Sequence, residues 1–167
     1  MKTIFKSVIC IIAVLCSDML NASEVGSLQF RLVDENPSSN EPQIKMKGAQ
    51  TKVRIKSEVV VDEKDILSVE SKEIMEFSPK DLKLKPSDTH HIILKLKTPG
   101  AKHLKEVTSA NIGKKMALLI NNEIICLLII HSEVSDTIGF SGDSLTENEK
   151  KDLIELIKKM IKENEKS

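Results

Sequence analysis

His131, Glu133 and Asp136 are the residues of this chain best spaced for chemistry. An imidazole beside two carboxylates can transfer protons as a general acid and base. Polar residues of this kind also occur in solvated connections between strands, where they carry no chemistry. We favour the solvated connection and keep a small hydrolase as the alternative.

Metal binding is not expected from the histidines. His90 and His91 are adjacent, so on a strand their side chains point to opposite faces and cannot both hold one ion. His103 and His131 have no cysteine or carboxylate at the spacing of metal ligands.

Nucleophilic and cofactor chemistry are not expected either. Ser109, Ser135 and Ser141 lie in no nucleophile-elbow sequence. The six glycines form no phosphate-binding loop. The sequence therefore predicts no catalytic, cofactor-binding or metal site, and no enzyme.

Charge and composition narrow the kinds of partner. The chain has 25 basic and 25 acidic residues, and a near-neutral, mixed surface offers no footprint for nucleic acid or an anionic membrane. Trp and Tyr are absent, although many nucleic-acid platforms and interface hot spots rely on aromatic rings. The core must be built from Ile, Leu, Val and Met.

Residues 1–22 have the layout of a secretory signal peptide. Lys2 and Lys6 give a basic start, residues 7–16 form an uncharged apolar run, and Ala22 is a small residue suited to cleavage. The run is about half the length of a membrane span, and an uncleaved anchor is the alternative. Cleavage would leave a periplasmic or secreted protein with one domain, residues 23–167, in which Cys126 is a lone, buried strand residue.

Several segments of the mature chain are typical of strands. Apolar residues alternate or run without a break at 27–34, 51–61, 91–97, 115–120, 123–130 and 136–141. Asn121-Asn122 suits a two-residue hairpin turn, and the run at 124–130 suggests a strand covered on both faces. The apolar residues at 62–77 fit either a helix or a strand, and we favour a short turn or strand over a long helix. Loops are expected at 35–47 and 78–89, where Pro and polar residues cluster.

Two helices have marked ends. Thr98 is the expected N-cap of a helix at about 98–112, with Pro99 in the first turn and Gly113 as a left-handed residue after its end. Thr146 and Glu149 form a capping box for a second helix at about 146–163, which carries an apolar stripe. The predicted fold class is α+β, a mixed or antiparallel sheet with both helices packed on it.

The order of several short motifs resembles a known family. Residues 107–120, VTSANIGKKMALLI, resemble the segment T-x-x-N-I-G-K-x-L-A-I in the head subdomain of the first large periplasmic domain of SecD and SecDF proteins. LQFRLVD at 28–34, SEVVVDEKDI at 57–66 and IGFSG at 138–142 are similar to family segments in the same order. The chain departs from the family at Asn121-Asn122, where Asp-Gly is usual, and at Ile124–Ile130, where a Pro-containing strand is usual.

The resemblance implies a non-enzymatic accessory or binding module of protein export that contacts translocating or unfolded polypeptide. It implies a protein or peptide partner, no nucleic acid, no small-molecule cofactor, and membrane contact only through a complex or an uncleaved signal. We expect a head that stands alone, without the membrane helices that a proton-coupled translocase needs. The alternative is a structural or interaction subunit of another cell-envelope complex, recruited through a strand edge near 123–130 or 27–34.

Overall fold

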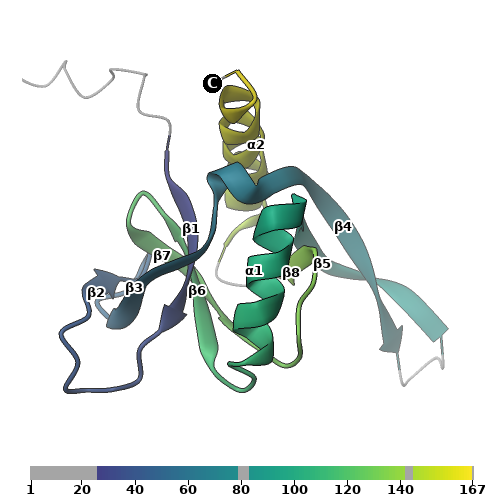
Figure 1. Ribbon diagram of the computed structural model, residues 1–167. Helices are drawn as coiled ribbons and strands as arrows, with labels where there is room; N and C mark the ends of the chain where they lie inside the picture. The colour runs from purple at the N-terminus through teal and green to yellow at the C-terminus, as the bar shows by residue number, and fades with distance from the viewer. Residues whose placement is uncertain (1–25, 79–82, 142–144, 167) are drawn as a thin grey trace, which may run out of the picture.

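The computed structural model describes residues 26–78, 83–141 and 145–166. The predicted signal peptide and its cleavage site lie outside the described residues. The predicted α+β class is confirmed: strands form two separate antiparallel sheets, and two helices pack with them (Figure 1).

The first sheet has five strands in the order β2-β3-β1-β6-β7. Its members are β1 (Leu28–Val33), β2 (Gln43–Lys45), β3 (Lys52–Asp62), β6 (Lys115–Ile120) and β7 (Glu123–Ile129). Met46, just after β2, makes one parallel bridge to Ile124 of β7. The two ends of this sheet therefore meet, so the sheet curls around a small core of Val33, Ile44, Ile55, Ala117, Leu119 and Ile124.

The β6–β7 hairpin forms as its turn residues predict. Asn121 and Asn122 have φ of 49° and 61°, the left-handed pair that a two-residue turn of this hand requires. The Asn121 side chain also accepts a hydrogen bond from the Ser27 amide at 3.0 Å. This contact joins the hairpin turn to the start of β1.

The second sheet has three strands in the order β4-β5-β8. A 3₁₀ turn at Glu63–Asp65 (η2) leads into β4 (Ile66–Ser78), which pairs with β5 (Lys83–Leu96), and β8 (Thr137–Phe140) completes the sheet. The prediction of a turn or strand, rather than a helix, at 62–77 is confirmed by η2 and β4. The far ends of β4 and β5 project from the body as an arm (Figure 1).

Two predicted loops contain strands. The prediction of a loop at 78–89 is wrong for residues 83–89, which belong to β5. Pro86 pairs with Met75 beside a register shift in β4, and proline is tolerated at such an irregularity because no ladder N–H is needed there. The predicted loop at 35–47 likewise contains the short strand β2.

Helix α1 (Thr98–Ser109) is shorter than predicted, and its N-cap is Lys97 rather than Thr98. The Ala101 amide donates to the Lys97 carbonyl at 2.9 Å, so the first helical bond starts one residue early. Pro99 lies in the first turn, as expected. Gly113 has the expected left-handed φ of 84°.

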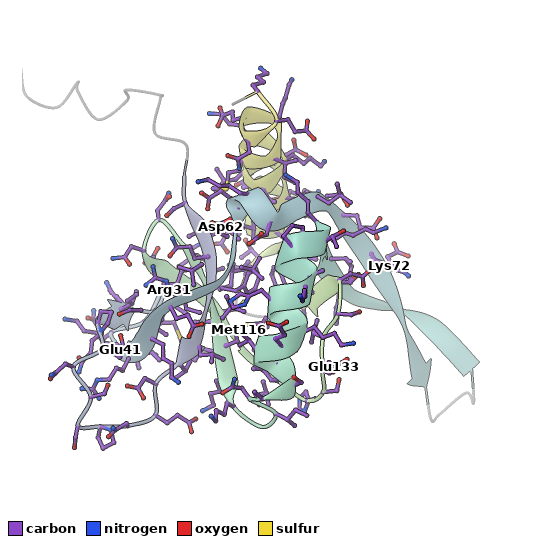
Figure 2. The ribbon with its side chains drawn as sticks, in the orientation of Figure 1. Arg31, Glu41, Asp62, Lys72, Met116 and Glu133 are labelled. Carbon is purple, nitrogen blue, oxygen red and sulfur yellow. The ribbon has the colours of Figure 1, made fainter. Side chains whose placement is uncertain are left out.

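Helix α2 (Glu147–Asn164) begins as predicted, with both bonds of the Thr146–Glu149 capping box present. Its buried residues Leu153, Ile154, Ile157 and Met160 form the apolar stripe. They join one large core with both sheets and with Leu104 of α1. Met116 of β6 belongs to this core and lies near the middle of the molecule (Figure 2).

Candidate functional site

The connection between β7 and β8 holds the three acid–base candidates, and α1 fixes its position. The Val134 amide donates to Thr108 Oγ1 at 2.9 Å, and Thr108 Oγ1 donates to the Leu104 carbonyl at 2.8 Å. Thr108 is fully buried, and its bond with Leu104 is buried while its bond with Val134 is partly buried. The connection is therefore a well-anchored segment along the end of α1.

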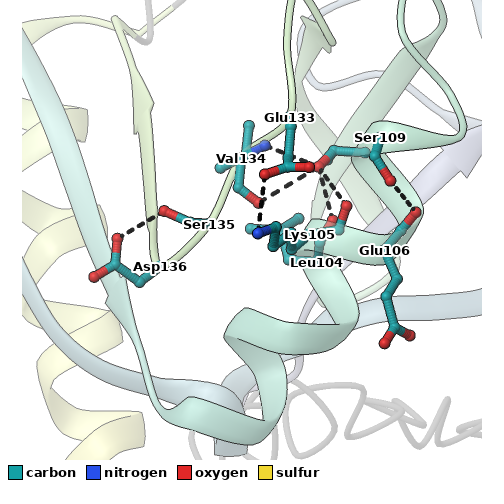
Figure 3. A network of polar contacts seen from close by, with 9 residues as sticks. Leu104, Lys105, Glu106, Ser109, Glu133, Val134, Ser135 and Asp136 are labelled. Carbon is teal, nitrogen blue, oxygen red and sulfur yellow. Dashed lines mark hydrogen bonds and ion pairs between the residues drawn. The ribbon is translucent and has the colours of Figure 1, made fainter.

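His131, Glu133 and Asp136 are all exposed on this segment and do not converge. Glu133 pairs with Lys105 at 3.2 Å, whereas Asp136 accepts from the Ser135 hydroxyl at 3.2 Å (Figure 3). Asp136 also accepts from the Thr137 hydroxyl at 3.2 Å. Only His131 lines the neighbouring hollow. The arrangement does not supply the shared pocket that the hydrolase alternative requires, and the solvated connection explains it.

The remaining chemical candidates lie apart. His91 is on β5 and His103 on α1, while the backbone of His90 pairs with Glu73 in the β4–β5 ladder. Ser109 Oγ donates to the Glu106 carbonyl at 2.9 Å. Within the described ranges, no three His, Cys, Asp or Glu side chains are grouped as metal ligands would be.

Cys126 lies on β7 and is partly covered. Burial raises the pKa of its thiol to about 12. A thiol with such a pKa stays protonated near neutral pH, so it behaves as a small apolar residue of the strand.

The T-x-x-N-I-G-K motif joins three elements at the end of α1. Asn111 Nδ2 donates to the Val107 carbonyl at 2.7 Å and Asn111 Oδ1 accepts from Lys114 Nζ at 2.9 Å. The amide of Gly113 donates to the Ile130 carbonyl at 2.7 Å. With Thr108, these contacts fasten α1 to β6 and to the end of β7, so the motif has a structural role.

The largest change from the sequence prediction concerns β7. The prediction that this strand is covered on both faces is confirmed only in part. Cys126 and Leu128 pack against the large core and Ile124 and Leu127 with the small one, but residues 125–128 are only partly buried and Ile129 is 53% exposed. β7 is the last strand in the order of its sheet. Its outer edge is covered near the start: β2 lies beside it, Met46 forms a bridge with Ile124, and the amide of Lys47 donates to the Ile124 carbonyl.

A first apolar hollow lies between the start of β7 and α2, and we call it the α2 hollow. Its volume is about 300 Å³. The apolar lining is Ile120, Ile125, Leu145, Leu153 and Leu156. Lys47, Asn121, Glu123, Glu149 and Asp152 complete the lining.

Lys47 and Glu149 form an ion pair in the lining of the α2 hollow. Their Nζ and Oε1 atoms are 2.7 Å apart, and each side chain is 38% exposed. Lys47 and the capping contacts with Thr146 together lower the pKa of Glu149 to about 2. This pair connects α2 with the segment that closes the first sheet.

A second hollow, the β8 hollow, lies between the end of β7 and β8. Its volume is about 200 Å³. Its lining includes the apolar residues Met116, Leu128, Ile129, Ile130, Val134 and Ile138, and its one titratable residue is His131. The two hollows flank the partly buried middle of β7, and we call the whole surface the β7 groove.

A strand edge near 123–130 was predicted as a docking edge for the alternative function, whereas the two hollows beside β7 were not predicted, because their lining comes from segments far apart in the sequence. The other predicted edge, near 27–34, is wrong, since β1 lies inside its sheet between β3 and β6. The signal that could have pointed to the hollows is the apolar run at 124–130. Such a run predicts burial, and an apolar strand that ends a sheet instead offers a surface to another chain.

The fold defines a small α+β domain whose apolar strand β7 ends one sheet beside two apolar hollows. The chain belongs to the family described as the SecDF P1 head subdomain, whose model matches residues 40–159. This confirms the resemblance over that range, which does not include the similar segment at 28–34. In this family the P1 head is a periplasmic domain.

Solved structures of SecDF share the fold. A structure described as a membrane component SecDF that enhances protein export is 16% identical with a TM-score of 0.53, over 81% of this chain and 62% of the other. SecDF in a Super-membrane-facing form is 19% identical with a TM-score of 0.53, over 82% of this chain and 19% of the other. The chain thus spans less than two thirds of either relative.

No curated protein matches this chain. No described helix is long and apolar enough to cross a membrane.

Proposed function

We propose that this chain is an exported, non-enzymatic accessory module of protein export that binds extended polypeptide along the β7 groove. Membership of the SecDF P1 head family supports a role in export and a periplasmic location. The observation that carries the binding role is the exposed apolar residue Ile129 at the end of β7, beside the apolar β8 hollow.

Binding by strand addition uses the geometry of β7. An extended chain beside an edge strand forms main-chain hydrogen bonds whatever its sequence, and alternate side chains enter pockets on one face. Two aliphatic side chains buried in the hollows would contribute about 3–6 kcal/mol before the cost of ordering the chain. The resulting affinity is weak, as suits an accessory protein that must release its client.

Ile129→Asp tests the proposal. Ile129 lines the β8 hollow and is 53% exposed, so the change places a charge in the groove at little cost to folding. We expect the variant to lose most of its binding to a reduced, alkylated protein that cannot refold, as measured by fluorescence anisotropy.

Leu67→Asp is the matched control. Leu67 lies on β4, is 48% exposed and lines neither hollow. This variant should bind like the unmodified chain. Equal binding by both variants would move the site away from β7, and failure of the unmodified chain to bind would refute the function.

The alternative is a structural or interaction subunit of another cell-envelope complex. β7 is the last strand in the order of its sheet, and its end near Ile129 could accept a strand of a folded partner. That role predicts a complex of fixed stoichiometry in native extracts and no binding of the unfolded probe.

A further inference from the structure

Two exposed apolar residues lie near each other at the end of β7. Among the described residues, three large apolar side chains are exposed, and two of them are Ile112, at 57%, and Ile129, at 53%. Ile112 lies in the turn between α1 and β6. The next residue, Gly113, donates its amide to the Ile130 carbonyl at 2.7 Å, so this turn lies beside the end of β7. We call Ile112, Ile129 and the β8 hollow together the terminal patch.

The β8 hollow gives the terminal patch a place for an apolar side chain. Ile129 is part of its mainly apolar lining, and its volume is about 200 Å³. An aliphatic side chain that enters the hollow removes apolar surface of both partners from water. Apolar contact of this kind does not distinguish one aliphatic segment from another, so any preference must come from the charges around the patch.

Two lysines stand beside the terminal patch. Lys115 is directly opposite Ile129 in the β6–β7 ladder, and side chains of directly paired residues lie on the same face of a sheet. Lys114 precedes it, and the Lys114 carbonyl accepts from the Ile130 amide at 2.9 Å. Both lysines are exposed, and neither forms an ion pair with a residue that the structure describes. Lys114 Nζ donates to an uncharged amide oxygen.

Carboxylates on the adjoining segments have other partners. Glu133, on the β7–β8 connection, pairs with Lys105 at 3.2 Å. Asp136 accepts from the hydroxyls of its two neighbours in the sequence. Asp34 lies beyond the part of β1 that pairs with β6, and it accepts from the Ser39 hydroxyl. The terminal patch therefore combines exposed apolar side chains with positive charge that these carboxylates do not pair with.

We infer that the terminal patch binds segments in which an aliphatic residue stands between acidic residues. The inference rests on the proposed function and adds the class of segment that this end of β7 prefers. The aliphatic side chain enters the β8 hollow, and the carboxylates face Lys114 and Lys115. The first half of β7 and the α2 hollow are not needed for this contact.

Short peptides test the inference on the full chain by NMR, which detects weak binding. Each peptide carries one Ile between two Glu, two Gln or two Lys residues, and the methyl resonances of Ile112 and Ile129 are followed. The Glu peptide should bind about 3–10-fold more tightly than the Gln peptide, and the Lys peptide more weakly, because exposed pairs contribute modestly. The preference should vanish at about 0.5 M salt, where the screening length is about 4 Å.

The variant Lys114→Gln/Lys115→Gln should lose the preference for Glu and keep its affinity for the Gln peptide. Lys159→Gln/Lys162→Gln is the matched control, because it removes the same charge from exposed residues of α2 that do not line the β8 hollow. It should keep the preference.

The outcomes separate this inference from the proposed function. If the Glu and Gln peptides bind equally, or if the control removes the preference as well, the inference is overturned and the function stands. The same holds if no peptide shifts the two methyl resonances although the unfolded protein probe binds. Shifts that depend on protein concentration without any peptide would show that a second copy covers the patch, and would also overturn the inference. If neither the peptides nor the unfolded protein bind, both are overturned.

Discussion

Thr108 is the residue on which the position of the β7–β8 connection most depends. Its buried hydroxyl accepts from the Val134 amide and donates to the Leu104 carbonyl. Thr108→Val keeps the shape of the side chain and leaves the Val134 amide without this partner. We expect a loss of about 1–3 kcal/mol in the free energy of unfolding, measured by urea denaturation.

Ser109→Ala is the control for this prediction. The Ser109 hydroxyl donates to the Glu106 carbonyl at an exposed position, so its loss should change stability by less than about 0.5 kcal/mol. A similar loss in both variants would show that the Thr108 contacts do not anchor the connection.

Turns and helix caps could be predicted from single residues where only the local backbone conformation determines them. The Asn121-Asn122 turn, the Thr146–Glu149 capping box and Gly113 each depend on nearby backbone geometry, and all three are confirmed. The N-cap at Thr98 was wrong because the helix begins one residue earlier, at a position without a capping side chain. His131, Glu133 and Asp136 do not converge because contacts with α1 fix the position of the segment that carries them. These tertiary contacts cannot be predicted from the spacing of the three residues.

At the scale of elements, the Lys47–Glu149 pair joins α2 to the closure of the first sheet. Glu149 is more acidic in the folded chain, with a pKa of about 2 against its ordinary 4.5. Its carboxylate therefore stabilises the fold above pH 4.5, and this contribution disappears as the pH falls toward 2. We expect Glu149→Gln to be less stable than the unmodified chain at pH 7 and nearly equal to it at pH 2.

Urea denaturation across this pH range measures the difference. Glu155→Gln is the control, because Glu155 pairs with Lys158 on an exposed part of α2. It should lower stability at pH 7 by less than Glu149→Gln. A constant difference between Glu149→Gln and the unmodified chain from pH 7 to pH 2 would contradict the proposed role of the ion pair.

Element types could be predicted from periodicity, whereas pairing and exposure could not. The strands at β1, β3, β6 and β8 and both helices follow their apolar patterns. Residues 83–89 were expected to be a loop because Pro86 and its charged neighbours are typical of one. Pairing with β4 overrides that composition. The exposure of β7 is decided by its place at the end of a sheet, and strand order is a property of the whole chain.

In the whole molecule, two sheets and two helices share one core, and β7 ends the order of the first sheet with Ile129 exposed. The arm of β4 and β5 projects elsewhere (Figure 1). The β7 groove combines residues near 47, 120–130, 134–139 and 145–156. Sequence spacing could not bring them together, although the motif order indicated the family.

Hydrogen exchange of β7 tests whether extended polypeptide binds at this strand. The full chain is compared with and without a saturating amount of the reduced, alkylated protein, and exchange is followed by mass spectrometry of peptides from each element. We expect slower exchange in residues 123–130 and no change in the arm of β4 and β5. The disulfide-intact, folded form of the same protein should have no effect. Unchanged exchange in β7, with protection of the arm or of no element, would refute binding at β7.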